Sequence, residues 1–91
     1  MDNDIAERTK KEIDMMEIVF KVLTIKDKDK QLALDFFDMA SNYFKDSKFF
    51  LDKQDYIRAF EAVVISWSYI DAGVKIGFFS VPQELAEHFT S

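Results

Sequence analysis

Few side chains in this 91-residue sequence could do chemistry, and the first candidates are Glu84 and His88. His88 follows Glu84 by four residues, so the two side chains would share one face of a helix and could supply part of a metal site. The sequence contains no cysteine and no second histidine to complete such a site. We therefore expect a surface histidine, and the sequence predicts no metal, no cofactor and no catalytic residue.

Asp71 is the other candidate, because it interrupts an apolar stretch next to Ala72 and Gly73. A carboxylate that is buried there needs a partner, since removing an unpaired charge from water is costly. One interpretation is a group that binds a ligand or transfers a proton. The interpretation that we favour is a structural ion pair, either with Lys75 four residues later or with a lysine of another helix.

Charge and hydropathy narrow the class of partner. The formal net charge is −5 and the lysines alternate with acidic residues, whereas nucleic-acid binding requires concentrated positive charge. The longest uncharged apolar run, residues 62–70, is far shorter than the roughly 20 residues that cross a bilayer. The lack of cysteine is typical of an intracellular protein. We expect a cytoplasmic protein that binds neither nucleic acid nor a membrane.

Apolar residues recur at steps of three and four in three segments of the chain, which is the period of an amphipathic helix. This pattern predicts a single all-α domain over residues 1–91, with helices at about 4–23, 29–50, 53–77 and, for a short fourth helix, 81–88. The joint between the second and third helices is short, which favours antiparallel neighbours. The predicted fold is an antiparallel three-helix bundle with a short C-terminal helix.

Cap signals set the predicted helix ends. Acidic side chains can accept hydrogen bonds from the first free N–H groups of a helix, and Asp4, Asp27 or Asp29, and Asp52 stand where such caps are expected. Gly77 is the predicted C-terminal cap of the third helix. The charged stretch at residues 24–30 is predicted to be a solvated loop, and residues 80–83 resemble a capping box for the short helix.

The third predicted helix is apolar on two faces. Its main stripe includes Trp67, which we expect to be buried against the first helix and Phe36 or Phe37. A second set lies about 180° away, and the first helix repeats the pattern. The two second sets are Ala62, Ile65, Tyr69, Ala72 and Ile76 on the third helix and Met15, Ile18, Val22 and Ile25 along the first. The predicted interface residues among them are Ile65, Tyr69 and Ile76 on the third helix and Met15, Ile18 and Val22 on the first.

These six residues have two interpretations. They are either ordinary rim residues, which are normal on protein surfaces, or one apolar patch that a partner covers. We favour the patch, with Tyr69 near its centre. Because closed two-fold pairing is the commonest way to cover such a surface, the expected partner is a second copy of the chain, and another protein is the alternative.

A motif runs through the second half of the chain. It comprises Tyr43-Phe44-x-Asp46, Phe50, Asp55-Tyr56 with Ala59, and then Trp67-x-x-Ile70-Asp71-Ala72-Gly73-Val74-Lys75-Ile76-Gly77 followed by Phe78 and Phe79. With these features, residues 40–79 resemble a small archaeal family that is known only as domain of unknown function 357. The resemblance implies a short, cytosolic, all-helical archaeal protein, and it brings no activity and no catalytic residue. It marks Tyr43, Asp46, Trp67, Asp71, Gly73 and Gly77 as structural motif residues.

The sequence therefore favours a non-enzymatic protein–protein interaction module that self-associates. The alternative from another class is a degenerate HEPN-like helical domain, related to nucleases or associated with RNA. The HEPN nuclease signature pairs an arginine with a histidine a few residues later, and Arg58 has no such histidine. That absence argues against the nuclease and leaves only a non-catalytic relative.

Overall fold

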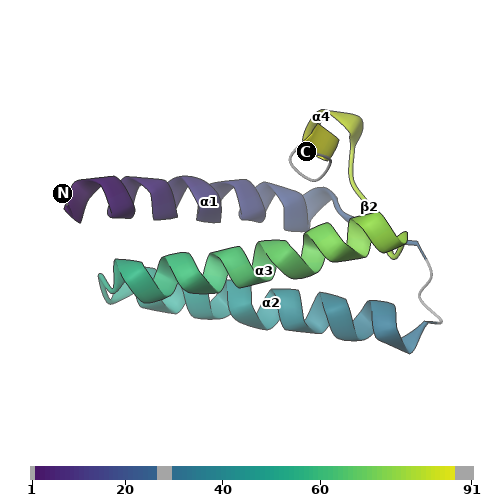
Figure 1. The fold of residues 1–91 in the computed structure, drawn as a ribbon, viewed down its shortest axis with the longest axis horizontal. Coiled ribbons are helices and arrows are strands. Elements are labelled where there is room, and N and C mark those ends of the chain that lie inside the picture. The colour runs from purple at the N-terminus through teal and green to yellow at the C-terminus, as the bar shows by residue number, and fades with distance from the viewer. Residues whose placement is uncertain (1, 27–29, 88–91) are drawn as a thin grey trace.

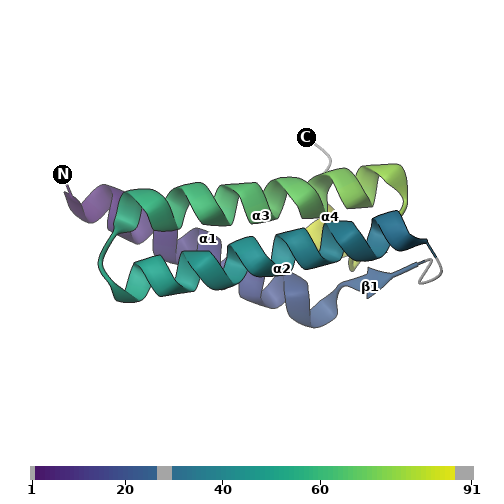
Figure 2. The same cartoon turned by 90° about the horizontal axis from the view of Figure 1, so that it is seen from below.

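Three long helices lie side by side in an elongated bundle (Figure 1). The computed structural model describes residues 2–26 and 30–87. The long helices are α1 (Asp2–Val22), α2 (Gln31–Asp52) and α3 (Tyr56–Ile76), and a short helix, α4 (Gln83–Ala86), follows them. Helix α2 runs antiparallel to both α1 and α3, as Figures 1 and 2 show. The predicted all-α fold class and the antiparallel three-helix bundle with a short C-terminal helix are confirmed.

Small side chains set the distance between α2 and α3. Ala40 and Ala59 are fully buried, and the Ser66 hydroxyl donates a 2.7 Å hydrogen bond to the Ala40 carbonyl across the two helices. Around this contact the core is aliphatic and aromatic, with Met16 and Ile70 fully buried. Trp67, which was expected to be buried against the first helix, packs against the core beside α1 but is only partly buried.

Two of the predicted helix starts were misplaced. Asp52 is the last residue of α2, and Asp55 is the N-cap of α3, where its Oδ1 accepts a 3.2 Å hydrogen bond from the Arg58 N–H. Asp4 lies inside α1 and does not cap it. Helix α2 begins after Lys30, which makes no side-chain cap bond, and the predicted caps Asp27 and Asp29 lie outside the described residues.

The cap of α3 gives a stability prediction. Asp55→Ala removes the acceptor for the Arg58 N–H and is expected to lower the free energy of unfolding by about 1 kcal/mol. The matched control is Asp52→Ala, which removes an exposed carboxylate three residues earlier and is expected to change stability by less than about 0.5 kcal/mol. Urea denaturation of both variants checks this. If Asp52→Ala lowered the free energy of unfolding more than Asp55→Ala does, Asp52 rather than Asp55 would be the residue that caps α3.

The C-terminal end of α3 is built as predicted. Gly77 adopts a left-handed φ of 96°, and its N–H donates to the carbonyls of Gly73 and Val74. The N–H of Phe78 donates a 2.8 Å hydrogen bond to the Gly73 carbonyl as well. Glycine adopts this conformation without steric cost, and the turn sends the chain back along the bundle.

The returning chain forms a short β-ladder that the sequence pattern did not predict. Strand β1 (Thr24–Ile25) pairs antiparallel with β2 (Phe79–Ser80), and the Lys26 N–H donates a 2.8 Å bond to the Phe78 carbonyl. The predicted loop at residues 24–30 is thus partly strand, and the predicted capping box at residues 80–83 was wrong because Pro82 is the N-cap of α4. The predicted fourth helix extended to His88, which lies outside the described residues.

Candidate interaction surface on helices α2 and α3

The six predicted interface residues differ in exposure. Ile76 is 58% exposed, Ile18 48%, Val22 40% and Ile65 38%. Met15 and Tyr69 are half-buried and pack against the hydrophobic core. The prediction of exposed apolar residues on both helices therefore holds for four of the six side chains.

The structure separates the residues of α1 from those of α3. The side of α3 that faces α1 carries Phe60, Val64 and Trp67, which line an open hollow together with Arg8 and Glu12 of α1. Tyr69 lies on another side of α3, where its ring contacts α2. Ile65, Tyr69 and Ile76 therefore do not form one patch with Met15, Ile18 and Val22.

Tyr69 belongs to a cluster of rings between α2 and α3. Its ring stacks on that of Tyr43, with centroids 6.3 Å apart and planes 14° apart. It also meets the ring of Phe36 edge-on, with centroids 5.6 Å apart. All three rings are half-buried, so one side of each ring is open to solvent. More exposed side chains of α2 and α3 lie next to them on the same surface.

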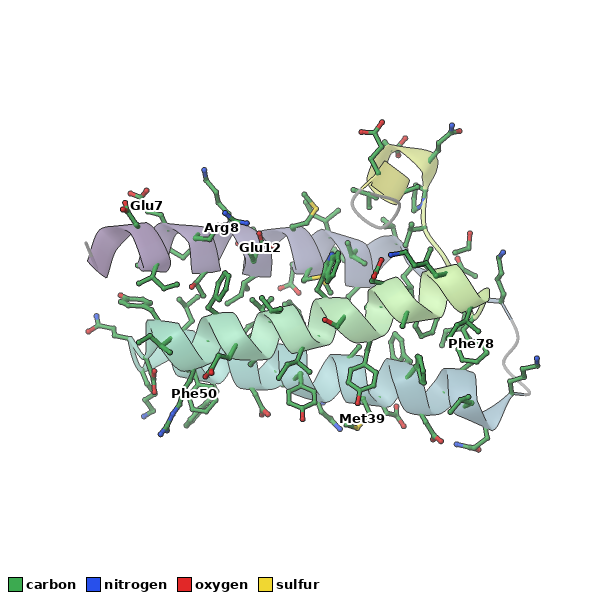
Figure 3. All side chains as sticks on the ribbon, in the orientation of Figure 1. Glu7, Arg8, Glu12, Met39, Phe50 and Phe78 are labelled. Atoms are coloured by element: carbon green, nitrogen blue, oxygen red, sulfur yellow. The ribbon has the colours of Figure 1, made fainter. Side chains whose placement is uncertain are left out.

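We call this surface the α2–α3 face. On α2 its residues follow steps of four, three, four and seven, and on α3 they follow steps of four, three and four, which is the spacing of a helix-packing seam. They are Leu32, Phe36, Met39, Tyr43 and Phe50 on α2 and Ile65, Tyr69, Ala72 and Ile76 on α3. Leu32 is 55% exposed and Met39 37%. Figure 3 shows Met39 and Phe50 on the side of the bundle away from α1.

Charged groups border the α2–α3 face. The exposed carboxylates of Asp35 and Asp46 lie on α2, and that of Glu61 lies on α3. The cations on this border are both paired: Arg58, whose guanidinium lies 5.9 Å from the centre of the Phe50 ring and whose Nε is 3.6 Å from Asp55 Oδ2, and Lys75, whose Nζ is 3.0 Å from Asp71 Oδ2. The face is thus apolar at its centre and mainly acidic at its edges.

The other motif residues support the packing of α3. Asp71 Oδ2 lies 3.0 Å from the Lys75 Nζ, so the favoured structural ion pair is present. Asp71 Oδ1 is buried and has no hydrogen-bond partner among residues 2–26 and 30–87. Gly73 is buried, and the Phe79 ring packs so closely on its backbone that a β-carbon at Gly73 would overlap the ring. Asp46 and Tyr43 lie on the α2–α3 face or its border.

Within residues 2–26 and 30–87, no cluster of three histidine, aspartate or glutamate side chains could hold a metal ion. No helix in this part of the chain is long and apolar enough to cross a bilayer. Glu84 is exposed, and its predicted partner His88 lies outside the described residues.

Sequence reasoning identified the α3 row of this face and missed the α2 row. The sequence predicts Phe36 as a packing partner of Trp67 and Tyr43 as a structural motif residue. The signal that could have identified the row was present, because Leu32 and Met39 continue the three- and four-residue steps of Phe36 and Tyr43, and Phe50 follows seven residues after Tyr43. Periodicity alone does not separate a fully buried stripe from a half-buried row beside it.

Comparison with known proteins gives two similarities. The model of a family described as "Protein of unknown function (DUF357)" matches residues 7–79. The crystal structure of protein AF1782 from Archaeoglobus fulgidus, which carries the same family model, superposes with a TM-score of 0.76 at 26% sequence identity, covering 89% of this chain and 97% of that one. No curated protein matches the chain significantly.

Proposed function

Because this chain belongs to the DUF357 family, which is defined without a known activity, we propose from its structure that it is a cytoplasmic, non-enzymatic protein–protein interaction module that self-associates through the α2–α3 face. The observation that carries the proposal is the row of apolar side chains on each of two adjacent helices. Leu32 and Ile76 are more than half exposed. Contiguous apolar surface of this kind marks interaction sites in water-exposed proteins.

The size of the face suits a second copy of the chain. Two adjacent helices of about 21 residues, each about 30 Å long and 10 Å wide, present roughly 600 Å² on one side. A stable interface buries about 800 Å² on each partner, so this face would form most of such an interface. Pairing two copies would place the apolar rows of α2 and α3 in the middle of a four-helix arrangement.

The charges at the border of the α2–α3 face argue against the alternative function, an RNA-associated, HEPN-like domain. Arg58, the residue on which that reading depends, is paired with Asp55 and lies over Phe50. The neighbouring carboxylates of Asp35, Asp46 and Glu61 are exposed. A phosphate backbone would be repelled by this border, whereas apolar pairing needs only that the carboxylates stay hydrated at the rim.

Ile65→Glu tests the proposed self-association. The parent protein is expected to sediment as a dimer at high micromolar concentration, and Ile65→Glu as a monomer with unchanged helical content, because the new carboxylate would have to be buried in the interface. Ile65 is a better site than Tyr69, since Tyr69 is packed between the rings of Phe36 and Tyr43 and its replacement would also disturb the fold.

The matched control is Ile57→Glu, which makes the same change on the same helix. Ile57 is 68% exposed and lies beside Ile5 and Tyr56, outside the α2–α3 face. Ile57→Glu is expected to remain a dimer. A parent protein that sediments as a monomer, or an Ile65→Glu variant that still dimerises, would overturn the proposed use of this face for self-association.

A further inference from the structure

The structure defines which residues of α2 and α3 lie at the same height along the bundle. Ala40 lies level with Ser66, which donates a hydrogen bond to its carbonyl. Phe36 lies level with Tyr69, and Phe50 lies level with Arg58. Because α2 and α3 are antiparallel, Met39 is then level with the stretch between Ile65 and Ser68, and Asp35 is level with Ala72.

Two copies that pair face to face are related by a two-fold axis lying within the interface. If that axis is perpendicular to the helices, α2 lies on α2 of the second copy and its two ends exchange places. If the axis is parallel to the helices, α2 lies on α3 of the second copy and the ends stay together. The two arrangements bring different border charges together.

The perpendicular arrangement is disfavoured by the acidic residues of α2. When the axis crosses the middle of α2, so that the two α2 helices overlap fully, Asp35 lies within about one turn of Asp46 of the second copy, and the two-fold axis repeats this contact. Both carboxylates are exposed on the border of the face, and neither belongs to a salt bridge among the described residues. Like charges that face each other across an interface oppose association.

The parallel arrangement separates these carboxylates. It places Asp35 level with the uncharged Ala72 of the second copy, and it brings Asp46 within about one turn of Arg58 of the second copy. Glu61 of the second copy lies at the same height as Asp46, so Asp46 meets one like charge and one opposite charge in this arrangement, whereas in the perpendicular arrangement it meets the carboxylate of Asp35. Rim charges contribute little affinity and act mainly by fixing the orientation of partners.

We infer that two copies of the chain pair about an axis parallel to their helices, so that α2 of each packs antiparallel on α3 of the other in a four-helix bundle. This inference rests on the proposed self-association. It assigns a partner to each row of the face: Leu32 meets Ile76 of the second copy, and Met39 and Tyr43 lie nearest to its Ile65.

Cysteine cross-linking tests the arrangement directly, because the chain has no native cysteine. Met39→Cys and Ile65→Cys are prepared separately and oxidised alone and as an equimolar mixture. In the inferred arrangement these two positions face each other, whereas α2 and α2 of the second copy lie on a diagonal about 14 Å apart. A disulfide requires Cα atoms closer than about 7 Å.

The mixture is therefore expected to give about tenfold more disulfide-linked dimer than either variant alone, because only the mixed pair satisfies the Cα limit. Lys11→Cys, on an exposed position of α1, reports cross-linking by random collision. Efficient linking of Met39→Cys or Ile65→Cys to itself would overturn the inferred axis and leave self-association intact. A monomeric parent in sedimentation would instead refute the proposed function, and the inference with it.

Discussion

Phe79→Ala is expected to lower the free energy of unfolding by about 3–5 kcal/mol, the usual cost of removing a fully buried aromatic ring. Phe79 is 1% exposed, although it stands in a two-residue strand after the last long helix. Its ring lies against Gly73 and meets the ring of Phe37 edge-on, with centroids 6.4 Å apart. The side chain thus joins the C-terminal segment to both α2 and α3.

Urea denaturation at one fixed protein concentration measures this effect, since the stability of a self-associating protein depends on concentration. The matched control is Phe49→Ala, because Phe49 is 57% exposed and its ring meets the Phe50 ring edge-on and lies under the Lys53 ammonium at the surface. Its replacement is expected to cost about 1 kcal/mol or less. A parent-like unfolding midpoint for Phe79→Ala would mean that the segment after Gly77 is not packed on the bundle.

Gly73→Ala is expected to destabilise the protein by about 1–2 kcal/mol, although alanine is the better helix former. The substitution gains up to about 1 kcal/mol of helix propensity. It also places a methyl group inside the space of the Phe79 ring, and overpacking of this kind costs about 1–3 kcal/mol. We expect the cost of overpacking to exceed the gain in helix propensity, because the buried Phe79 ring cannot turn away from the new methyl group without opening the core.

A double-mutant cycle separates the clash from other effects of Gly73→Ala. Phe79→Leu shortens the side chain that the new methyl group meets, so the double variant is expected to lose less stability than the two single changes added together. Strict additivity would refute the proposed contact. Gly77→Ala is the reference for a purely conformational cost, since its φ of 96° disfavours alanine while no atom lies within 4 Å of the added carbon.

The helices were predictable because a 3.6-residue period repeated over five turns is a strong signal. The cap of α3 was misplaced by one turn because Asp52 and Asp55 both have the right side chain, and only the end of α2 decides between them. The β-ladder was not predictable, because strands of two residues are too short to show any alternation. Phe79 therefore had no pattern to indicate that it is buried.

Only the α3 row of the candidate surface was predictable from the sequence, because the pattern of a helix does not show which other helix lies beside each of its sides. The pattern indicated that Ile65, Tyr69 and Ile76 form a second row on α3, and the structure places that row against α2. The side of α3 on which α1 packs depends on the handedness of the bundle, which the period of a helix does not encode. Met15, Ile18 and Val22 were consequently assigned to the wrong neighbours.

The pairing of Ile25 with Phe79 also bears on the order in which the molecule folds. It closes a loop of chain that contains both α2 and α3, and the entropy cost of closure grows with the logarithm of the free chain between the ends. Once α2 and α3 have formed their hairpin, that free chain is much shorter. We therefore expect the hairpin to form first, with α1 docking as the ladder closes. For local opening of the folded protein we expect the reverse order, in which α1 and β1 detach while α2 and α3 remain paired.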